Sequence, residues 1–208
     1  MTTPARRVVV LQAGLGQPSS TALLAHRLGS ATSDALLERG LESDVRVVDL
    51  RDHAQALAST LLTGFATGAL REDLDALAAA DAVIAVTPVY QASFSGLFKT
   101  FVDVVDEGSL RGTPVLMAAT AGTARHSLVL EHAMRPMFAY LKAVTVPTAV
   151  FAASEDWGSA GTVDQGLETR IRVAAGELAD LVSGGSAPRP RVDDFTAPEG
   201  FEELLRRA

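Results

Sequence analysis

Three consecutive hydroxyl side chains, Ser19, Ser20 and Thr21, follow a loop that contains Gly14 and Gly16. An apolar run precedes this loop, and leucines at helical spacing follow it, so the hydroxyls coincide with the start of a helix. Free N–H groups and the positive end of the helix dipole meet at such a start and hold phosphate well. Neutral hydroxyls without a nearby cation suit a terminal phosphate monoester.

Two familiar phosphate loops do not fit this stretch. Ser19 stands where the dinucleotide-binding fingerprint needs its third glycine, and the acid that ends the second apolar run, Asp49, lies too far along the chain. We expect Asp49 to be the last residue of its strand and to have a structural role in the turn that follows. The Gly-Lys-Ser/Thr of a Walker A loop is missing. Because Ser or Thr also begins ordinary helices, the loop alone leaves open whether it binds phosphate or only caps a helix.

A second segment, residues 87–103, has the sequence "TPVYQASFSGLFKTFVD". Its Pro88 and Tyr90 follow an apolar run, and an exposed proline and tyrosine suit a flat aromatic ligand. A helix is expected to begin near Ser93 or Ser95, with a stripe of core-packing side chains: Phe94, Phe98, Phe101 and Val105. On the same helix, Lys99 and Asp103 are expected to form a solvated pair.

The elements that must position these residues alternate along the chain. Four short apolar runs, "RRVVVLQA", "DVRVVDL", "DAVIAVTP" and "TPVLMAAT", and a fifth, "VTVPTAVFAA", which Pro147 interrupts, are separated by helical stretches. Strands of this kind are buried on both faces, which predicts an α/β fold with a three-layer, doubly wound, five-stranded parallel sheet. Ligands of such sheets bind at the carboxyl ends of the strands, which here are followed by residues 13–21, 87–96 and 120–126.

Composition narrows the classes of function. The 208-residue chain has a net charge of −7, which argues against nucleic-acid binding and against docking on anionic membranes. The absence of cysteine excludes disulfides, thiolate zinc sites and thiol redox chemistry, so a redox function would need a bound cofactor. No run approaches the length of a membrane span, and the short apolar run near the start is a strand rather than a signal peptide, so we expect a cytoplasmic protein. Residues 1–183 are expected to form one domain, followed by a Pro/Gly-rich linker and a short helix at 184–208.

The second segment resembles the T-P-x-Y-x-x-S-x-S-G-x-L-K-x-x-x-D signature of NAD(P)H-dependent FMN reductases, which have a flavodoxin-like fold. The opening loop and "ATAGTARHSLVLEHAMRPMFAYLKA" at 119–143 extend the resemblance, which covers residues 6 to 155. The most similar members are reductases that supply reduced FMN to alkanesulfonate-type, luciferase-like monooxygenases. Where many members have a Ser and an Arg in the first loop, this chain has Leu15 and Gln17, so phosphate binding would rest on hydroxyls and backbone amides.

The resemblance implies hydride transfer from NADPH or NADH to FMN, with no acid–base pair required. It implies flavin-binding residues in three loops: Leu15, Gly16, Ser19, Ser20 and Thr21; Pro88, Val89, Tyr90, Gln91 and Ser95; and Thr120, Ala121, Gly122 and Thr123. In the third loop, Gly122 would allow close approach of the backbone to the flavin ring. Arg125 and His126 are candidates for contact with the nicotinamide coenzyme, although a capping or packing role is favoured for His126.

Other residues are given structural interpretations. His126 and His132 fall on different helix faces, which argues against a metal site, and His26 and His53 are expected at the surface. Pro136 is expected to kink a helix over 128–142. The stripe on that helix, together with the phenylalanine stripe, could form the interface of a homodimer or homotetramer or could be buried within one chain. The stripe consists of Leu130, Met134, Phe138 and Leu141.

Two other functions remain open on the same scaffold. One is an NAD(P)H-dependent quinone, azo-dye or metal-ion reductase with bound FMN, for which free flavin would be a poor substrate. The other is a non-enzymatic flavodoxin-like electron carrier, which would stabilise a one-electron reduced flavin.

Overall fold

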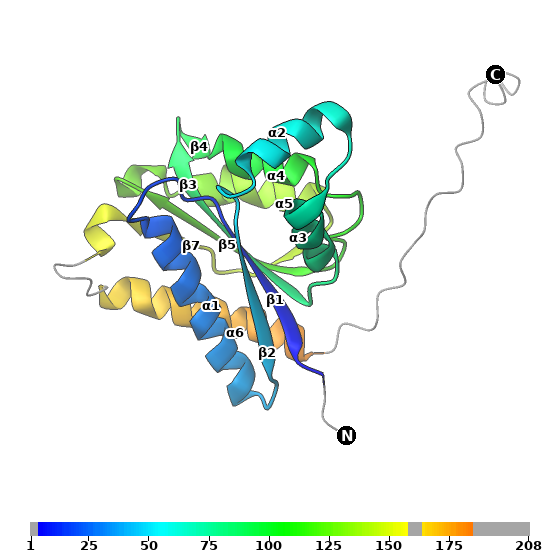
Figure 1. Ribbon diagram of the computed structural model, residues 1–208. Helices are drawn as coiled ribbons and strands as arrows, with labels where there is room; N and C mark the ends of the chain where they lie inside the picture. Colours follow the sequence, from blue (N-terminus) through cyan, green and yellow to red (C-terminus); the bar gives the residue numbers. More distant parts are fainter. Residues whose placement is uncertain (1–3, 158–163, 185–208) are drawn as a thin grey trace, which may run out of the picture.

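Within the described residues, 4–157 and 164–184 of this computed structural model, seven strands form one sheet that helices cover on both faces (Figure 1). The strands are β1 (Arg6–Gln12), β2 (Ser43–Asp49), β3 (Ala82–Tyr90), β4 (Ser93–Phe94), β5 (Pro114–Ala121), β6 (Val144–Thr145) and β7 (Val150–Ala153). The α-helices are α1 (Ser20–Glu38), α2 (Ala54–Thr63), α3 (Gly68–Ala78), α4 (Gly96–Asp103), α5 (Arg135–Tyr140) and α6 (Gln165–Ser183). Shorter turns are the 3₁₀ segments η1 (Ala124–His126) and η3 (Ser154–Asp156) and the π-helical segment η2 (Leu130–Met134).

The strand order is β2-β1-β3-β5-β6, with β7 also paired to β5, and all of these pairs are parallel. Counting β6 and β7 as one interrupted strand gives the 2-1-3-4-5 order of flavodoxin-like sheets. The predicted doubly wound, five-stranded parallel sheet is therefore confirmed. The carboxyl ends of β1, β3, β5 and β7 meet at one edge.

Pro147 divides the fifth strand, as its lack of an N–H requires. Val146 still donates its N–H to the Val115 carbonyl at 3.0 Å. One residue after the proline, Thr148 donates its N–H to Glu177 Oε2 on α6 at 2.7 Å, so a side chain replaces the sheet partner there. Pairing with β5 resumes at Val150.

Side-chain alternation along the strands divides the core into two clusters. Val8 and Val10 pack toward α1 and α6, whereas Val9 and Leu11 pack toward α2, α3, α4 and α5. The second cluster takes up the apolar side chains of the two predicted stripes: Phe94, Phe98, Phe101, Val105, Leu130, Met134, Phe138 and Leu141. Because these stripes lie inside one chain, their interpretation as a subunit interface is wrong, and the alternative of internal burial is confirmed.

The helix expected over 128–142 is not continuous. The π-helical segment η2 is followed directly by α5, and the Arg135 N–H donates to the Leu130 carbonyl five residues back. Pro136 has no N–H, and its ring crowds the carbonyl four residues earlier, so a wider turn before it avoids the clash. The proline therefore produces a π-helical turn rather than a simple kink.

A two-stranded hairpin that the sequence did not predict precedes α4. Strand β4 runs antiparallel to the end of β3, with Tyr90 opposite Ser93. Gln91 and Ala92, which form the turn, have φ values of +49° and +67°, a left-handed conformation that costs free energy in residues other than glycine. The helix then begins at Gly96 with Ser95 as its N-cap, the later of the two expected starts.

No helix in the described part of the chain is both long enough and apolar enough to cross a membrane.

Candidate functional site

An open cleft of about 240 Å³ lies at the edge where the carboxyl ends of the parallel strands meet. Four segments line it, one from each of four strand ends: Leu15, Gly16, Pro18, Ser19, Ser20 and Thr21 after β1; Pro88, Val89 and Tyr90 in β3; Thr120, Ala121 and Gly122 at the end of β5; and Ser154 after β7. The three loops that the sequence predicted to carry ligands therefore come together in one place.

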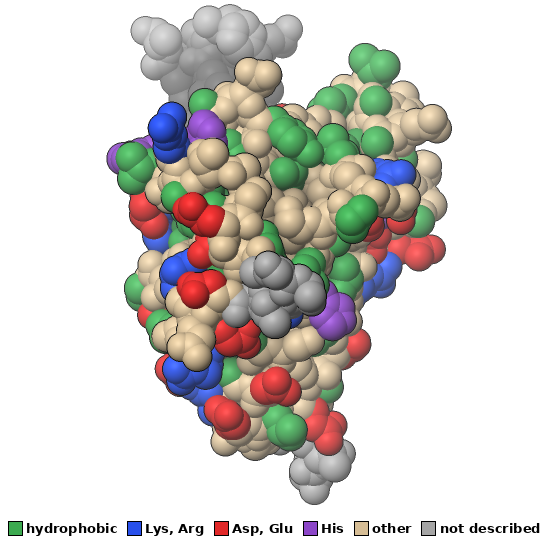
Figure 2. Space-filling view, turned by 90° about the vertical axis from the view of Figure 1, so that its left-hand side faces the viewer, with side chains coloured by type: hydrophobic (Ala, Val, Ile, Leu, Met, Phe, Trp, Pro, Cys, Tyr) green, Lys and Arg blue, Asp and Glu red, His purple; other side chains and the backbone are tan. Residues whose placement is uncertain are grey.

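The cleft wall carries no acidic or basic side chain among the described residues. Figure 2 views this side of the molecule, where uncharged polar side chains, backbone and apolar side chains dominate the upper half and charged groups lie mostly toward the margins and below. An anionic ligand would therefore be held by N–H and O–H donors and by the amino end of α1 rather than by a cation in the wall.

Ser19 begins α1 as its N-cap, and its Oγ accepts a hydrogen bond from the Ala22 N–H at 3.1 Å. The N–H groups of Ser20 and Thr21 have no acceptor among the described residues, as expected for the first turn of a helix. The loop is thus both a capped helix start and a cluster of unused donors that faces the cleft.

Gly14 makes this arrangement possible, although its φ is not positive. A Cβ atom at this position would overlap Ser19 Oγ and would lie 3.0 Å from Gln12 Oε1 and 3.1 Å from Thr21 Cβ. The Gly14 N–H instead donates to Gln12 Oε1 at 2.9 Å. The first glycine of the loop is therefore required by close packing of neighbouring side chains rather than by a tight turn.

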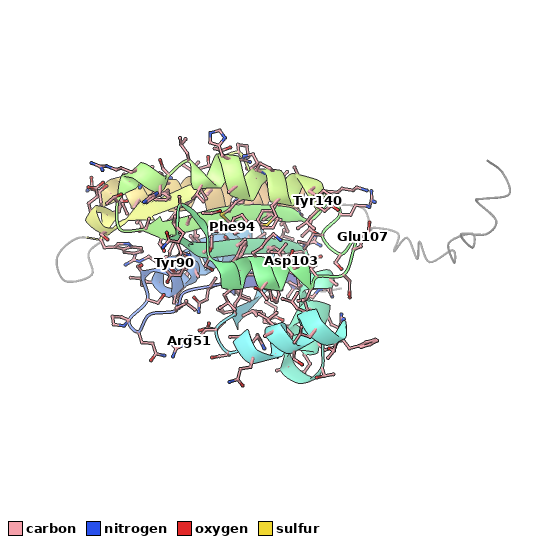
Figure 3. All side chains as sticks on the ribbon, turned by 90° about the horizontal axis from the view of Figure 1, so that it is seen from above. Arg51, Tyr90, Phe94, Asp103, Glu107 and Tyr140 are labelled. Atoms are coloured by element: carbon pink, nitrogen blue, oxygen red, sulfur yellow. The ribbon has the colours of Figure 1, made fainter. Side chains whose placement is uncertain are left out.

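The second wall is the end of β3 with its hairpin. Tyr90 is 45% exposed at the cleft, and Figure 3 shows it near Phe94 of the neighbouring strand. Gln91 occupies the turn and does not line the cleft. Ser95 is buried, caps α4 by accepting the Phe98 N–H at 3.2 Å, and lies behind the wall rather than in it.

The third wall ends in an exposed stretch. Thr120, Ala121 and Gly122 line the cleft, and all residues from Gly122 to Leu128 are exposed. Nothing lies within 4 Å of a Cβ built on Gly122, so the backbone there is open to a ligand. Thr123 is exposed but does not line the cleft.

Arg125 and His126 lie in η1, just beyond this wall, and both are exposed. Neither side chain has a hydrogen-bond or ion-pair partner within the described residues, so a capping hydrogen bond from His126 is not found there. Within the described residues, Arg125 is therefore a cation without an acidic partner, next to a cleft whose lining carries no charged side chain.

The structure also places four other residues or pairs that the sequence singled out: His53, His26, the Lys99–Asp103 pair and Asp49. His53 is buried and shares a 2.7 Å hydrogen bond with Asp73, which also binds Arg46, so its expected surface position is wrong. The sequence signal was ambiguous because a histidine after a strand looks like a loop residue until its partner on α3 is known. His26 is exposed, as expected. The exposed Lys99–Asp103 pair forms at 2.5 Å. Asp49 accepts the Arg51 N–H in a turn, as expected.

Two cleft residues, Pro18 and Ser154, were not predicted. Ser154 follows the fifth strand, so the rule that ligands bind at strand ends could have found it. The fifth apolar run does end at Ala153, directly before Ser154, but the residue after it was not among the predicted ligand-binding loops.

A second hollow, of about 260 Å³, lies at the opposite edge of the sheet, among Ala5, Ser33, Leu41 and Ser43. Its two serine hydroxyls bond each other at 2.7 Å, and none of the predicted ligand-binding loops reaches it. The cleft at the carboxyl edge is therefore the candidate site.

In a comparison with known proteins, residues 6–158 match the family model of the NADPH-dependent FMN reductases. An FMN reductase (NADPH) from Pseudomonas aeruginosa is 40% identical over 89% of this chain and 97% of its own length. An NADH-dependent FMN reductase, SfnE, from Pseudomonas putida is 35% identical over 91% of this chain and 98% of its own length. The crystal structure of an oxidoreductase from Corynebacterium diphtheriae is 43% identical and superposes with a TM-score of 0.83 over 88% of this chain and 99% of that one.

Proposed function

The chain belongs to the NADPH-dependent FMN reductase family and is an NAD(P)H-dependent FMN reductase, and from this premise we propose that the cleft at the carboxyl edge is its flavin site. The phosphate would lie at the amino end of α1, held by Ser19, Ser20 and Thr21. The ring would lie between Pro88, Val89 and Tyr90 on one side and Thr120, Ala121 and Gly122 on the other. Leu15 and Gly16 would contact the chain between phosphate and ring.

One observation carries this assignment: the predicted loops meet in a cleft that, as far as the described residues line it, holds unused donors at a helix start and no charged side chain. A phosphate monoester fits the free N–H groups of Ser20 and Thr21. A flat aromatic ring fits the open backbone at Gly122 opposite Tyr90. The residues present therefore fit FMN.

When bound, FMN supplies the redox chemistry by accepting a hydride from the reduced nicotinamide. The protein's own residues bind the flavin and hold it in a fixed orientation. The donors at the start of α1 fix the phosphate end, and the carbonyl and amide groups of residues 120–122 would meet the polar edge of the ring. None of the lining residues needs to accept or donate a proton for this role.

Arg125 is proposed to bind the phosphates of the nicotinamide coenzyme, and His126 to lie beside it at the entrance. Support comes from their exposure next to the cleft and from the absence of an acidic partner for Arg125 among the described residues. A cation that has no intramolecular partner is available to an anionic substrate. Gln91, Ser95 and Thr123 do not line the cleft, so we propose that they support the flavin-binding wall from behind or beside it.

We further propose that reduced FMN leaves the protein and serves a flavin-dependent monooxygenase. Support comes from the exposed rim, Gly122 to Leu128, and the half-exposed Tyr90, which leave the cleft open to solvent.

A homodimer or homotetramer is also proposed. Its basis is two apolar side chains at the end of α2 and just beyond it, Leu62 and Phe65, which are 89% and 78% exposed.

The deciding experiment measures oxidation of NADH and of NADPH by absorbance, with and without FMN. We expect oxidation only when FMN is added or retained, and faster turnover with free FMN than with a quinone.

Arg125→Gln is expected to raise the KM for the coenzyme roughly threefold or more, with FMN affinity unchanged. Arg111→Gln, at the opposite edge of the sheet, is the matched control. No flavin-dependent oxidation by the wild type would refute the proposed function.

A further inference from the structure

Two buried threonine hydroxyls join opposite walls of the cleft. Thr21 Oγ1 lies 2.7 Å from Thr120 Oγ1, and the two residues are separated by 99 positions in the chain. Thr21 belongs to the first turn of α1, and Thr120 lies near the end of β5. Each residue is only 3% exposed, yet both line the cleft.

The position of Thr21 is fixed on two sides. Its Cβ lies so close to Gly14 that a methyl group on that glycine would be 3.1 Å away. On the other side, the hydrogen bond to Thr120 holds its hydroxyl. Thr21 therefore presents its hydroxyl in a set orientation, at the helix start where the phosphate is proposed to bind.

A hydroxyl has one proton to donate and two lone pairs that accept. If Thr21 donates to Thr120, a lone pair of Thr21 is left to face the ligand. If Thr120 donates to Thr21, the proton of Thr21 is left free for the ligand. Because none of the described lining residues is charged, the direction of this bond decides whether Thr21 repels or attracts an anion.

We propose that Thr120 is a positioning residue for the flavin phosphate. Its hydroxyl donates to Thr21, and Thr21 in turn donates to a phosphate oxygen. Hydrogen bonds in such a chain polarise one another, so the donor that meets the anion is strengthened. The side chain of Thr120 thus serves the phosphate end of the ligand, whereas its backbone lies in the wall assigned to the ring. This inference rests on the proposed function.

The test is a binding titration of FMN and of riboflavin, which lacks the phosphate, without a nicotinamide coenzyme. Thr120→Val keeps the shape of the side chain and removes its hydroxyl. We expect it to weaken FMN binding roughly five- to tenfold and to change riboflavin binding less than about twofold. Thr120→Ser is expected to restore FMN affinity. Thr21→Val with Thr120→Val is expected to bind FMN no more weakly than Thr21→Val alone, because the second hydroxyl acts through the first.

Thr32→Val is the matched control. Thr32 is a fully buried threonine farther along α1, and its hydroxyl has no partner among the described residues, so this variant should leave the affinities for both flavins unchanged. If Thr120→Val does not fold, Thr120→Ala removes the same hydroxyl with a smaller side chain and makes the same comparison. Equal loss of FMN and riboflavin affinity, no loss of either, or additive effects of the two substitutions would overturn the positioning role. A wild type that bound neither flavin would instead refute the proposed function.

Discussion

At the scale of single residues, the site depends on two glycines, Gly14 and Gly122, because neither has a side chain. Gly14 gives room to the Ser19 side chain that caps α1 and to Thr21. Gly122 leaves open space at the cleft. The two glycines therefore act differently: the first lets protein side chains pack, and the second leaves the backbone accessible to a ligand.

Gly14→Ala is expected to destabilise the protein by about 1–2 kcal/mol and to weaken FMN binding. The added methyl group overlaps Ser19 Oγ, so the helix loses its N-cap and the hydroxyl cluster shifts. Chemical denaturation and an FMN titration measure the two effects.

Gly96→Ala is the control, because a Cβ there meets nothing within 4 Å and its φ is not positive. It should leave stability and FMN affinity nearly unchanged. Wild-type behaviour of Gly14→Ala would show that the loop accommodates a side chain and that the packing argument is wrong.

At the scale of elements, the π-helical segment η2 is connected to the interrupted fifth strand by one side chain. Arg135 donates to both carboxylate oxygens of Glu131, to Thr145 Oγ1 at 2.8 Å and to the carbonyls of Val146 and Pro147. Two irregularities, each caused by a proline, therefore stabilise each other. The hydrogen bonds from Arg135 lower the pKa of Glu131 below its ordinary value of 4.5, and the charge of Arg135 adds to this effect while partial burial opposes it.

The lowered pKa predicts how stability changes with pH. Because the folded state binds the Glu131 proton more weakly than the unfolded state, the stabilisation is fully present above pH 4.5 and is lost as the pH falls through the lower folded pKa. Glu131→Gln is expected to lower stability near neutral pH by less than about 1 kcal/mol, since the glutamate is half exposed, and to approach the wild type in acid. Urea denaturation at several pH values measures this.

Glu72→Gln serves as the control for Glu131→Gln. Glu72 is exposed and has no ion-pair partner in the part of the chain that the structure describes, so its substitution should not produce this profile. A stability difference between the wild type and Glu131→Gln that stays constant down to acidic pH would contradict the role of the ion pair.

At the scale of the whole molecule, two core clusters on opposite faces of one sheet hold the strand ends together and so form the cleft. As far as the described residues define them, both clusters and the cleft consist of residues up to Val182. The short helix expected in the tail, beyond residue 184, lies outside the described residues. We therefore propose that residues 1–183 form the flavin-binding domain.

A chain that ends at Gly184 is expected to keep the FMN affinity of the full chain and to change the free energy of unfolding by no more than about 0.5 kcal/mol, because no described core residue is removed. Thermal denaturation and an FMN titration of the two chains make the comparison. Loss of flavin binding by the shorter chain would assign the tail a part in the site.

The sequence by itself determined the five parallel strands and the loops that meet at the cleft, because apolar runs, helical spacing and glycine, serine and threonine clusters are local patterns, but it did not predict the antiparallel β4. Only the tertiary structure decided the burial of His53 against Asp73 and the bond from Thr148 to Glu177 at the break in the fifth strand. The same holds for the bond between Thr21 and Thr120, which are 99 positions apart. Each of these depends on which distant side chain fills the space or accepts the hydrogen bond, and a pattern along the chain carries no information about partners that only folding brings within reach.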